Sequence, residues 1–158
     1  MNERQDFDGK KKCDNSCRVL VVDDNEDVAN SLVALLQVMS VDACAVYDGL
    51  TAIEMIPSFK PQLVFLDIDM PDMDGHETAR RIRAIPIAGA IFLAAFSGLP
   101  KTFRTTSTED VFDTYFMKPL DDRVLGNLLC AVLSERGARA CKHCPACQGG
   151  APERPQFN

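Results

Sequence analysis

The chain lacks an apolar run long enough to cross a membrane, which would need about 18 consecutive apolar residues. Its first residues are polar and charged, which is not the pattern of a signal peptide. Positive charge is also in short supply, with 17 Lys and Arg against 23 Asp and Glu and a net charge of −6. These deficits predict a cytoplasmic protein with no membrane insertion and no nucleic-acid partner.

Histidine is nearly absent, since only His76 and His143 occur. We expect His76 to lie in solvent at the start of a helix. Cysteine is more frequent, but the seven cysteines of a cytoplasmic protein do not predict a disulfide framework. Cys44 and Cys130 fall on a predicted strand and a predicted helix, where packing in the core is expected.

What the chain does contain is a set of buried strands that end in polar side chains. Residues 63–66 are four apolar residues that lead directly into Asp67, before a loop with Pro71 and Gly75. An apolar run bounded by turn residues is typical of a strand buried on both faces. Its last residue lies at the carboxyl edge of the sheet, where open α/β folds bind their ligands. Asp67 by itself could also cap a turn, so the residues at the ends of the other strands are needed to distinguish a functional role from a capping role.

Three further predicted strands end in the same way. They are residues 18–22 before Asp23 and Asp24, residues 90–96 before Ser97, and residues 114–117 before Lys118. Each of these features is weak alone. Because parallel strands bring their carboxyl ends to one edge of a sheet, together they predict a site with three acids, a hydroxyl and a lysine.

Helical periodicity alternates with these strands. Helices are expected over about 25–39, 51–58, 76–84 and 124–133, with a short second strand at 43–46. Residues 101–111 should form a further helix but are rich in threonine, which favours helices poorly. Residues 39–41 lack the glycine that often ends a helix.

The order of these elements predicts the fold and the domain boundaries. With right-handed crossovers, alternation predicts an α/β fold, a flavodoxin-like doubly wound five-stranded parallel sheet, (βα)5, with strand order 2-1-3-4-5. The domain should span residues 17–135, between a polar arm at 1–16 and a cysteine-containing, flexible tail at 136–158.

The residues at the carboxyl edge suit one kind of chemistry. Asp67 is ionised at neutral pH, so it can attack an activated electrophile without a general base. Three neighbouring carboxylates, Asp23, Asp24 and Asp67, repel one another unless a cation is bound, and hard oxygen ligands suit Mg²⁺. Lys118 and the Ser97 hydroxyl would stabilise a transferring phosphoryl group. The set indicates a metal-assisted phosphoryl acceptor.

Over roughly residues 17–135 the chain resembles a response-regulator receiver domain of two-component signalling, of the stand-alone, chemotaxis-receiver-like kind. The motifs that carry the resemblance are residues 21–24, 66–75, 96–98 and 115–119. The resemblance implies phosphoryl transfer from the phosphohistidine of a histidine kinase or histidine phosphotransfer protein. It also implies a switched surface for an unidentified downstream protein, and no enzymatic activity beyond self-directed phosphotransfer and autodephosphorylation.

The resemblance also assigns roles to single residues. Asp67 is the phosphoacceptor, and Asp23, Asp24 and Asp67 hold Mg²⁺ together with the backbone carbonyl of Asp69. Ser97 is the switch hydroxyl and Tyr115 the aromatic side chain that changes rotamer with it. Lys118 is aimed into the site by a cis peptide bond to Pro119. The carboxylate of Asp69 is a departure, which either alters phospho-aspartate hydrolysis or is a solvated loop acid.

Cysteines near both predicted ends of the domain leave a second function open. Cys13 and Cys17 precede the first strand, and Cys141, Cys144 and Cys147 follow the last helix. Both groups emerge at the edge opposite the phosphorylation site, so two thiolates from each could form a structural Zn²⁺ site. The chain would then be a metal- or redox-sensing protein on a receiver scaffold. Tails whose thiols have no role are the preferred alternative. A receiver cut from a hybrid histidine kinase is a third reading, which Met1 and the short tail disfavour.

Overall fold

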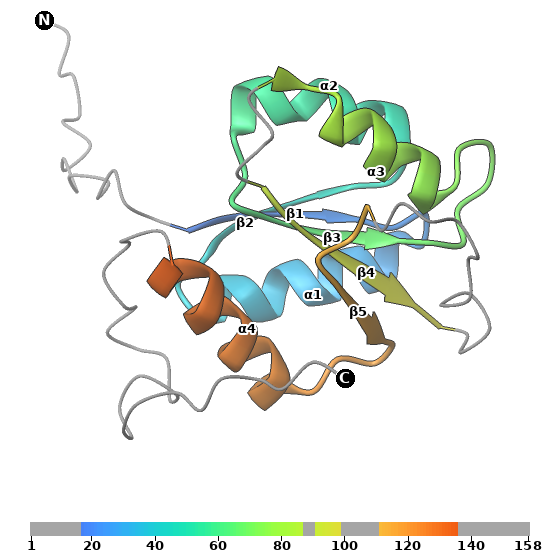
Figure 1. The fold of residues 1–158 in the computed structure, drawn as a ribbon. Coiled ribbons are helices and arrows are strands. Elements are labelled where there is room, and N and C mark those ends of the chain that lie inside the picture. The colour runs from blue at the N-terminus through green and yellow to red at the C-terminus, as the bar shows by residue number, and fades with distance from the viewer. Residues whose placement is uncertain (1–16, 87–90, 99–110, 136–158) are drawn as a thin grey trace, which may run out of the picture.

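The computed structural model describes residues 17–86, 91–98 and 111–135, which form a parallel β-sheet covered by helices on both faces (Figure 1). The five strands are hydrogen-bonded in the order β2-β1-β3-β4-β5. Their bounds are β1 Arg18–Val22, β2 Asp42–Val46, β3 Leu63–Asp67, β4 Phe92–Ser97 and β5 Thr114–Met117. The predicted fold class and strand order are confirmed.

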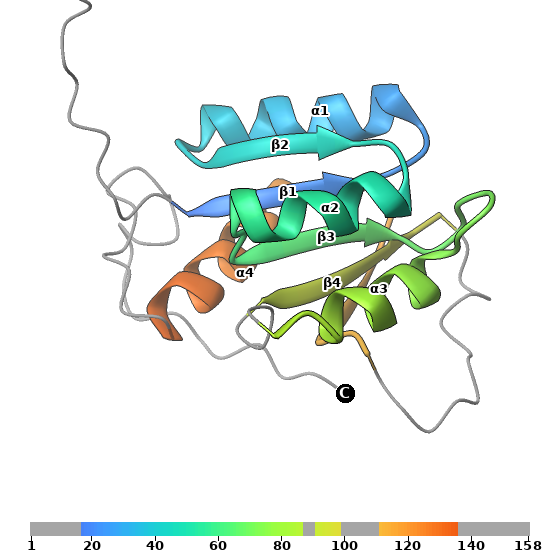
Figure 2. The same cartoon turned by 90° about the horizontal axis from the view of Figure 1, so that it is seen from above.

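Helices form one layer on each face of the sheet. α1 (Glu26–Val38) and α4 (Asp122–Glu135) pack on one face, and α2 (Gly49–Phe59) and α3 (Gly75–Arg83) pack on the other. Figure 2, seen from above, shows α2 and α3 lying over the strands. Among the described helices, none is both long and apolar enough to cross a bilayer. The predicted arm, the tail and all but the last residue of the weak helix at 101–111 lie outside the described residues.

Each of the first three helices begins at a side chain that caps its amino end. Asn25 accepts hydrogen bonds from two backbone N–H groups of the first turn of α1, at 3.1 and 3.2 Å. Asp48 and Asp74 cap α2 and α3 in the same way, each at 2.8 Å. Because Asp48 caps it, α2 begins at Gly49 rather than at residue 51. Hydrogen bonds from the hydroxyl and the N–H of Thr51 hold the pKa of Asp48 below its usual value.

Two helices end without glycine. Ser40 follows α1 with φ of 64°, and Lys60 follows α2 with φ of 50°. Both angles lie in the left-handed region that glycine usually occupies after a helix. The missing glycine at residues 39–41 therefore does not prevent α1 from ending where the sequence predicts.

β3 is buried on both faces, as the sequence predicts. Leu63 and Phe65 belong to the core under α1 and α4, and Val64 and Leu66 belong to the core under α2 and α3. Successive side chains of a strand point to opposite faces, so the central strand contributes to both cores. Packing on both sides thereby sets the position of Asp67 at the end of this strand.

Arg83 ties α3 to the amino-terminal edge of the sheet. Its guanidinium donates to the backbone carbonyls of Val111 and Ile91 at 3.1 and 2.7 Å, and to the Asp113 carboxylate at 2.6 Å. Asp113 also accepts a hydrogen bond from the N–H of Leu93 at 2.7 Å. One side chain thus connects α3, the start of β4 and the approach to β5.

We expect Arg83→Gln to lower the free energy of unfolding by about 2 kcal/mol, because charge-assisted hydrogen bonds are lost and carbonyl partners are left unpaired. Urea unfolding followed by circular dichroism measures the change. Arg81→Gln is the matched control, since among the described residues Arg81 of the same helix pairs with the half-exposed Glu77 alone, at 2.8 Å, and its substitution should cost less than about 0.5 kcal/mol. Equal losses in the two variants would contradict this role of Arg83.

Candidate phosphoryl-acceptor site

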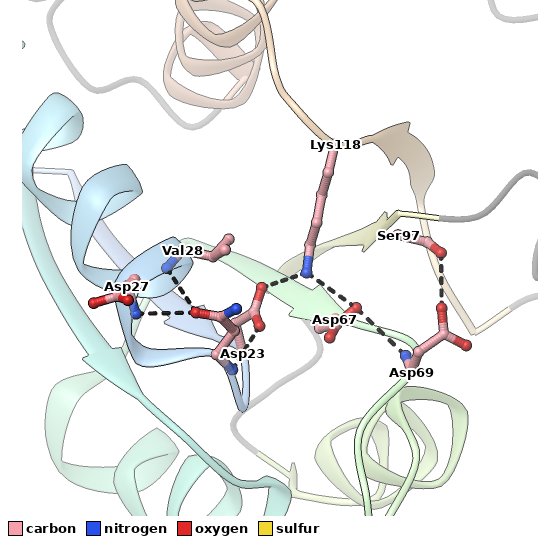
Figure 3. Close-up of polar contacts among 8 residues, drawn as sticks. Asp23, Asp27, Val28, Asp67, Asp69, Ser97 and Lys118 are labelled. Atoms are coloured by element: carbon pink, nitrogen blue, oxygen red, sulfur yellow. Dashed lines mark hydrogen bonds and ion pairs between the residues drawn. The ribbon is translucent and has the colours of Figure 1, made fainter.

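The side chains predicted to form a site meet at the carboxyl edge of the sheet (Figure 3). Asp67 is the last residue of β3 and Ser97 is the last residue of β4. Asp23 directly follows β1, and Lys118 directly follows β5. Parallel alignment of the four strands brings these chemically different groups to one place, although they are far apart in the sequence.

Asp23, Asp24 and Asp67 form a cluster of carboxylates. One oxygen from each lies within 4.8 Å of the others, and no other group of acids, histidines or cysteines in the described part of the chain is spaced for a cation. Asp23 and Asp67 are 1% and 4% exposed, whereas Asp24 is exposed. Hard oxygen donors with one open side fit Mg²⁺, which keeps waters or substrate oxygens as further ligands.

Lys118 reaches across the site to two of these acids. Its Nζ lies 2.5 Å from Oδ2 of Asp23 and 3.4 Å from Oδ1 of Asp67. The ammonium also lies 5.3 Å from the ring centroid of Phe96. The peptide bond between Lys118 and Pro119 is cis, which confirms the sequence-based expectation. Lys118 therefore supplies the positive charge closest to the carboxylate of Asp67 among the ion pairs of the described residues.

Burial raises the pKa of Asp67 above its usual value of 3.8, and the negative charge of Asp23 adds to this effect. The ammonium of Lys118 opposes it, as does a long hydrogen bond of 3.4 Å from the N–H of Asp69. The net direction means that the protein compensates the charge of Asp67 incompletely. A nearby cation would therefore stabilise the negative charge of this carboxylate, and a reaction at its oxygen would remove that charge from the carboxylate.

Ser97 and Asp69 are in direct contact, which the sequence did not predict. The Ser97 hydroxyl donates a hydrogen bond to Oδ2 of Asp69 at 3.1 Å (Figure 3). Ser97 is fully buried, whereas Asp69 is exposed on the loop after β3. The pairing of Asp67 with Phe96 across β3 and β4 is the reason, because it sets Ser97 beside the start of this loop. The alternative that Asp69 is only a solvated loop acid therefore does not describe this side chain, which accepts a hydrogen bond from a buried hydroxyl.

Tyr115 lies on the same face of the sheet as Ser97. It pairs with Ala95 across β4 and β5, and Ser97 is two residues further along β4. The Tyr115 ring packs edge-on against Phe112 at 5.5 Å, and Phe112 packs edge-on against His76 at 5.3 Å. The prediction that His76 lies in solvent is wrong, because its Nε2 is buried. The helix begins at Gly75, one residue before the predicted start, and only the tertiary structure places an aromatic side chain beside His76.

The predicted Zn²⁺ site finds no support. Cys17 is buried in the core under α1 and α4, where its side chain packs with apolar neighbours. Cys13, Cys141, Cys144 and Cys147 lie outside the described residues. Within the described ranges, nothing favours the metal- or redox-sensing alternative, whereas the acidic cluster at the opposite edge has cation-ligand spacing.

Residues 19–129 match the response regulator receiver domain family. The chain belongs to this family, a class of two-component signalling domains that are generally not enzymes and that act with histidine kinases. The chain is similar to the receiver domain (CheY-like) from Methylobacillus flagellatus, with a TM-score of 0.68 and 26% identity over 74% of this chain and 98% of that one. The resemblance based on four motifs is confirmed.

Similar full-length proteins are longer than this chain. Regulatory protein VanRB of Enterococcus faecalis is 35% identical over 127 residues, which cover 79% of this chain and 56% of that protein. The DNA-binding response regulator MtrA of Mycobacterium tuberculosis is 31% identical over 117 residues, 68% of this chain and 46% of that protein. This chain thus spans about half the length of these relatives. Because MtrA is described as DNA-binding, the expected lack of a nucleic-acid partner has no support.

Proposed function

We propose that Asp67 accepts a phosphoryl group from the phosphohistidine of a histidine kinase or histidine phosphotransfer protein. The observation that carries this proposal is the position of its buried carboxylate, within 4.8 Å of those of Asp23 and Asp24 and 3.4 Å from Nζ of Lys118. Membership in the receiver family supports the same reaction class.

The chemistry follows from the charges in the site. An oxygen of the Asp67 carboxylate attacks phosphorus, the bond from phosphorus to the donor imidazole breaks, and the imidazole nitrogen keeps the electron pair. Asp67 is ionised before the attack, so no general base is needed. Lys118 would pair with an oxygen of the phosphoryl group as charge develops there. The product is an acyl phosphate on Asp67.

A divalent cation would complete the site. Asp23, Asp24 and Asp67 would hold Mg²⁺ with the backbone carbonyl of Asp69, and when bound the ion neutralises charge on the carboxylates and on the phosphoryl oxygens. Asp23 is already oriented by hydrogen bonds, since it accepts one from the N–H of Asn25 at 3.0 Å and one from Lys118. Asp24 is the exposed member and would meet the ion from the solvent side.

The readout would be a change in the surface next to β5. The Ser97 hydroxyl would donate to the phosphoryl group and Tyr115 would follow it inward, because both lie on one face of the sheet. Met117 on β5 and Val124 on α4 are 49% and 40% exposed, so apolar side chains are available there for a downstream protein. Phosphorylation would shift this surface between two states of different partner affinity.

The test is labelling by a small phosphodonor such as acetyl phosphate, with and without Mg²⁺. We expect labelling only with Mg²⁺, its loss with excess EDTA, and a rate at least about tenfold lower in Asp24→Asn, which removes one charged ligand. Asp27→Asn is the matched control, since Asp27 is an exposed acid of the first turn of α1 outside the cluster. Equal labelling with EDTA, or equal effects of the two substitutions, would contradict the assigned cation site.

A further inference from the structure

We propose that Asp69 is a positioning residue that holds the Ser97 hydroxyl away from the phosphorylation site until Asp67 is phosphorylated. This inference rests on the proposed function and adds a regulator to it. It assigns the carboxylate of Asp69 to the balance between the two states of the switch, and not to the phosphoryl transfer itself.

The hydrogen bond between the two side chains has a defined direction. A carboxylate can only accept, so the hydroxyl proton of Ser97 points to Oδ2 of Asp69, 3.1 Å away. A hydroxyl has one proton to donate. While Ser97 donates to Asp69, it cannot donate to a phosphoryl oxygen, whatever its lone pairs accept.

Phosphorylation would therefore set two acceptors in competition for one donor. Asp67 and Ser97 end the neighbouring strands β3 and β4 at the same edge of the sheet, so a phosphoryl group that extends from Asp67 beyond this edge would come within reach of the same hydroxyl. The phosphoryl group carries more negative charge than a carboxylate and is the stronger acceptor. It would also repel the carboxylate of Asp69, whose backbone N–H lies 3.4 Å from Oδ1 of Asp67.

The consequence concerns the position of an equilibrium. Every hydrogen bond that must break on phosphorylation favours the unphosphorylated arrangement. Asp69 would thus keep the switch off at rest and would lower the apparent affinity for a phosphoryl mimic. Asp69 is exposed, so its carboxylate can turn into solvent after releasing Ser97 and need not stay buried without a partner.

The experiment measures the affinity of the full chain for beryllofluoride with Mg²⁺. The chain contains no tryptophan, so binding is followed by amide chemical shifts in NMR spectra. Asp69→Asn keeps a neutral acceptor, and Asp69→Ala removes the acceptor. We expect affinity to rise about threefold in the first variant and about tenfold in the second, the range for loss of one competing hydrogen bond. Without beryllofluoride, the Ser97 amide shift of Asp69→Ala should move toward that of the bound wild type.

Two controls separate this contact from general effects of charge. Asp72→Asn removes a charge from the same loop, and Asn tolerates the φ of 66° at that position, so this variant should bind like the wild type. In a Ser97→Ala background, Asp69→Ala should raise the affinity clearly less than in the wild type, because only the charge repulsion by Asp69 is then removed and no competition for the hydroxyl. Such a double-mutant cycle reports the coupling between the two side chains.

The outcomes are distinguishable from failure of the proposed function. If the wild type binds beryllofluoride and Asp69→Ala binds no more tightly, or if its gain persists in full without Ser97, the role of Asp69 is wrong and phosphorylation of Asp67 still stands. If neither the wild type nor any variant binds beryllofluoride with Mg²⁺, the proposed phosphoryl-acceptor function itself is overturned.

Discussion

Asp67→Asn is expected to abolish phosphoryl labelling and, at neutral pH, to raise the free energy of unfolding. The two side chains are nearly the same size, so the fold should be retained, but an amide is not a nucleophile toward phosphorus. The stability gain follows from burial, which raises the pKa of Asp67 and so disfavours its charged form in the folded protein. We expect a gain on the order of 1 kcal/mol in the absence of Mg²⁺.

This gain should depend on pH in a defined direction. Because the pKa of Asp67 is higher in the folded than in the unfolded protein, the folded protein binds the proton more tightly. The wild type therefore gains stability from this residue as the pH falls through the folded pKa toward the unfolded value of 3.8. The advantage of Asp67→Asn should be largest at neutral pH and should shrink on acidification. Urea unfolding of both proteins at several pH values measures it.

Two control measurements separate the effect of burying the Asp67 charge from the general effect of removing a negative charge. Asp24→Asn removes an exposed charge from the same cluster, so without Mg²⁺ it should change the stability much less than Asp67→Asn. Saturating Mg²⁺ should stabilise the wild type more than Asp67→Asn, because the variant lacks one charged ligand. Undiminished, base-labile labelling of Asp67→Asn would show that another residue accepts the phosphoryl group.

Gly75→Ala is expected to destabilise the fold by about 1–3 kcal/mol, the usual cost of a group added where there is no space. A Cβ atom at Gly75 would lie 2.3 Å from the backbone carbonyl oxygen of Asp67 and 2.8 Å from Cα of Ile68. Backbone atoms cannot turn aside as a flexible side chain can, so the start of α3 must move away from the end of β3. The same movement should disturb Asp67, and we expect slower labelling by acetyl phosphate as well.

Gly98→Ala is the matched control, because a Cβ atom at Gly98 would have no neighbour within 4 Å among the residues that the structure describes. Its free energy of unfolding should lie within about 0.5 kcal/mol of that of the wild type, as is usual for surface substitutions. Thermal and urea unfolding compare the three proteins. If Gly75→Ala were as stable as Gly98→Ala, the close approach of α3 to β3 would not be the reason for glycine at residue 75.

The fold was predictable because its signals are local. An exposed strand alternates apolar and polar residues, whereas the uninterrupted apolar runs of this chain indicate parallel strands buried on both faces. β3 is buried along its whole length, as this pattern predicts. The boundaries were less predictable. α2 begins at Gly49 because Asp48 caps it, and α1 ends at a left-handed Ser40 in place of a glycine. Each helix end depends on a single hydrogen bond or a single backbone angle. The periodicity of apolar residues extends over many positions and does not locate such an end to one residue.

The composition of the site was predictable for a related reason. In a parallel sheet the residues that end the strands or directly follow them lie at the same edge, so sequence position alone brings Asp67, Asp23 and Lys118 together. The ion pairs from Lys118 to both acids agree with that expectation. The proposed cation-binding role of the acids follows from the mutual repulsion of like charges, a property of the residue types themselves.

The order of residues along the strands was enough to predict the class of fold, the family and the residues of the candidate site. Which of these side chains contact one another depends on how the strands and helices pack. The hydrogen bond from Ser97 to Asp69, the aromatic contact over His76 and the backbone approach at Gly75 all join segments from different elements. Their geometry depends on strand register and helix packing, which are set by the whole core and not by any single motif.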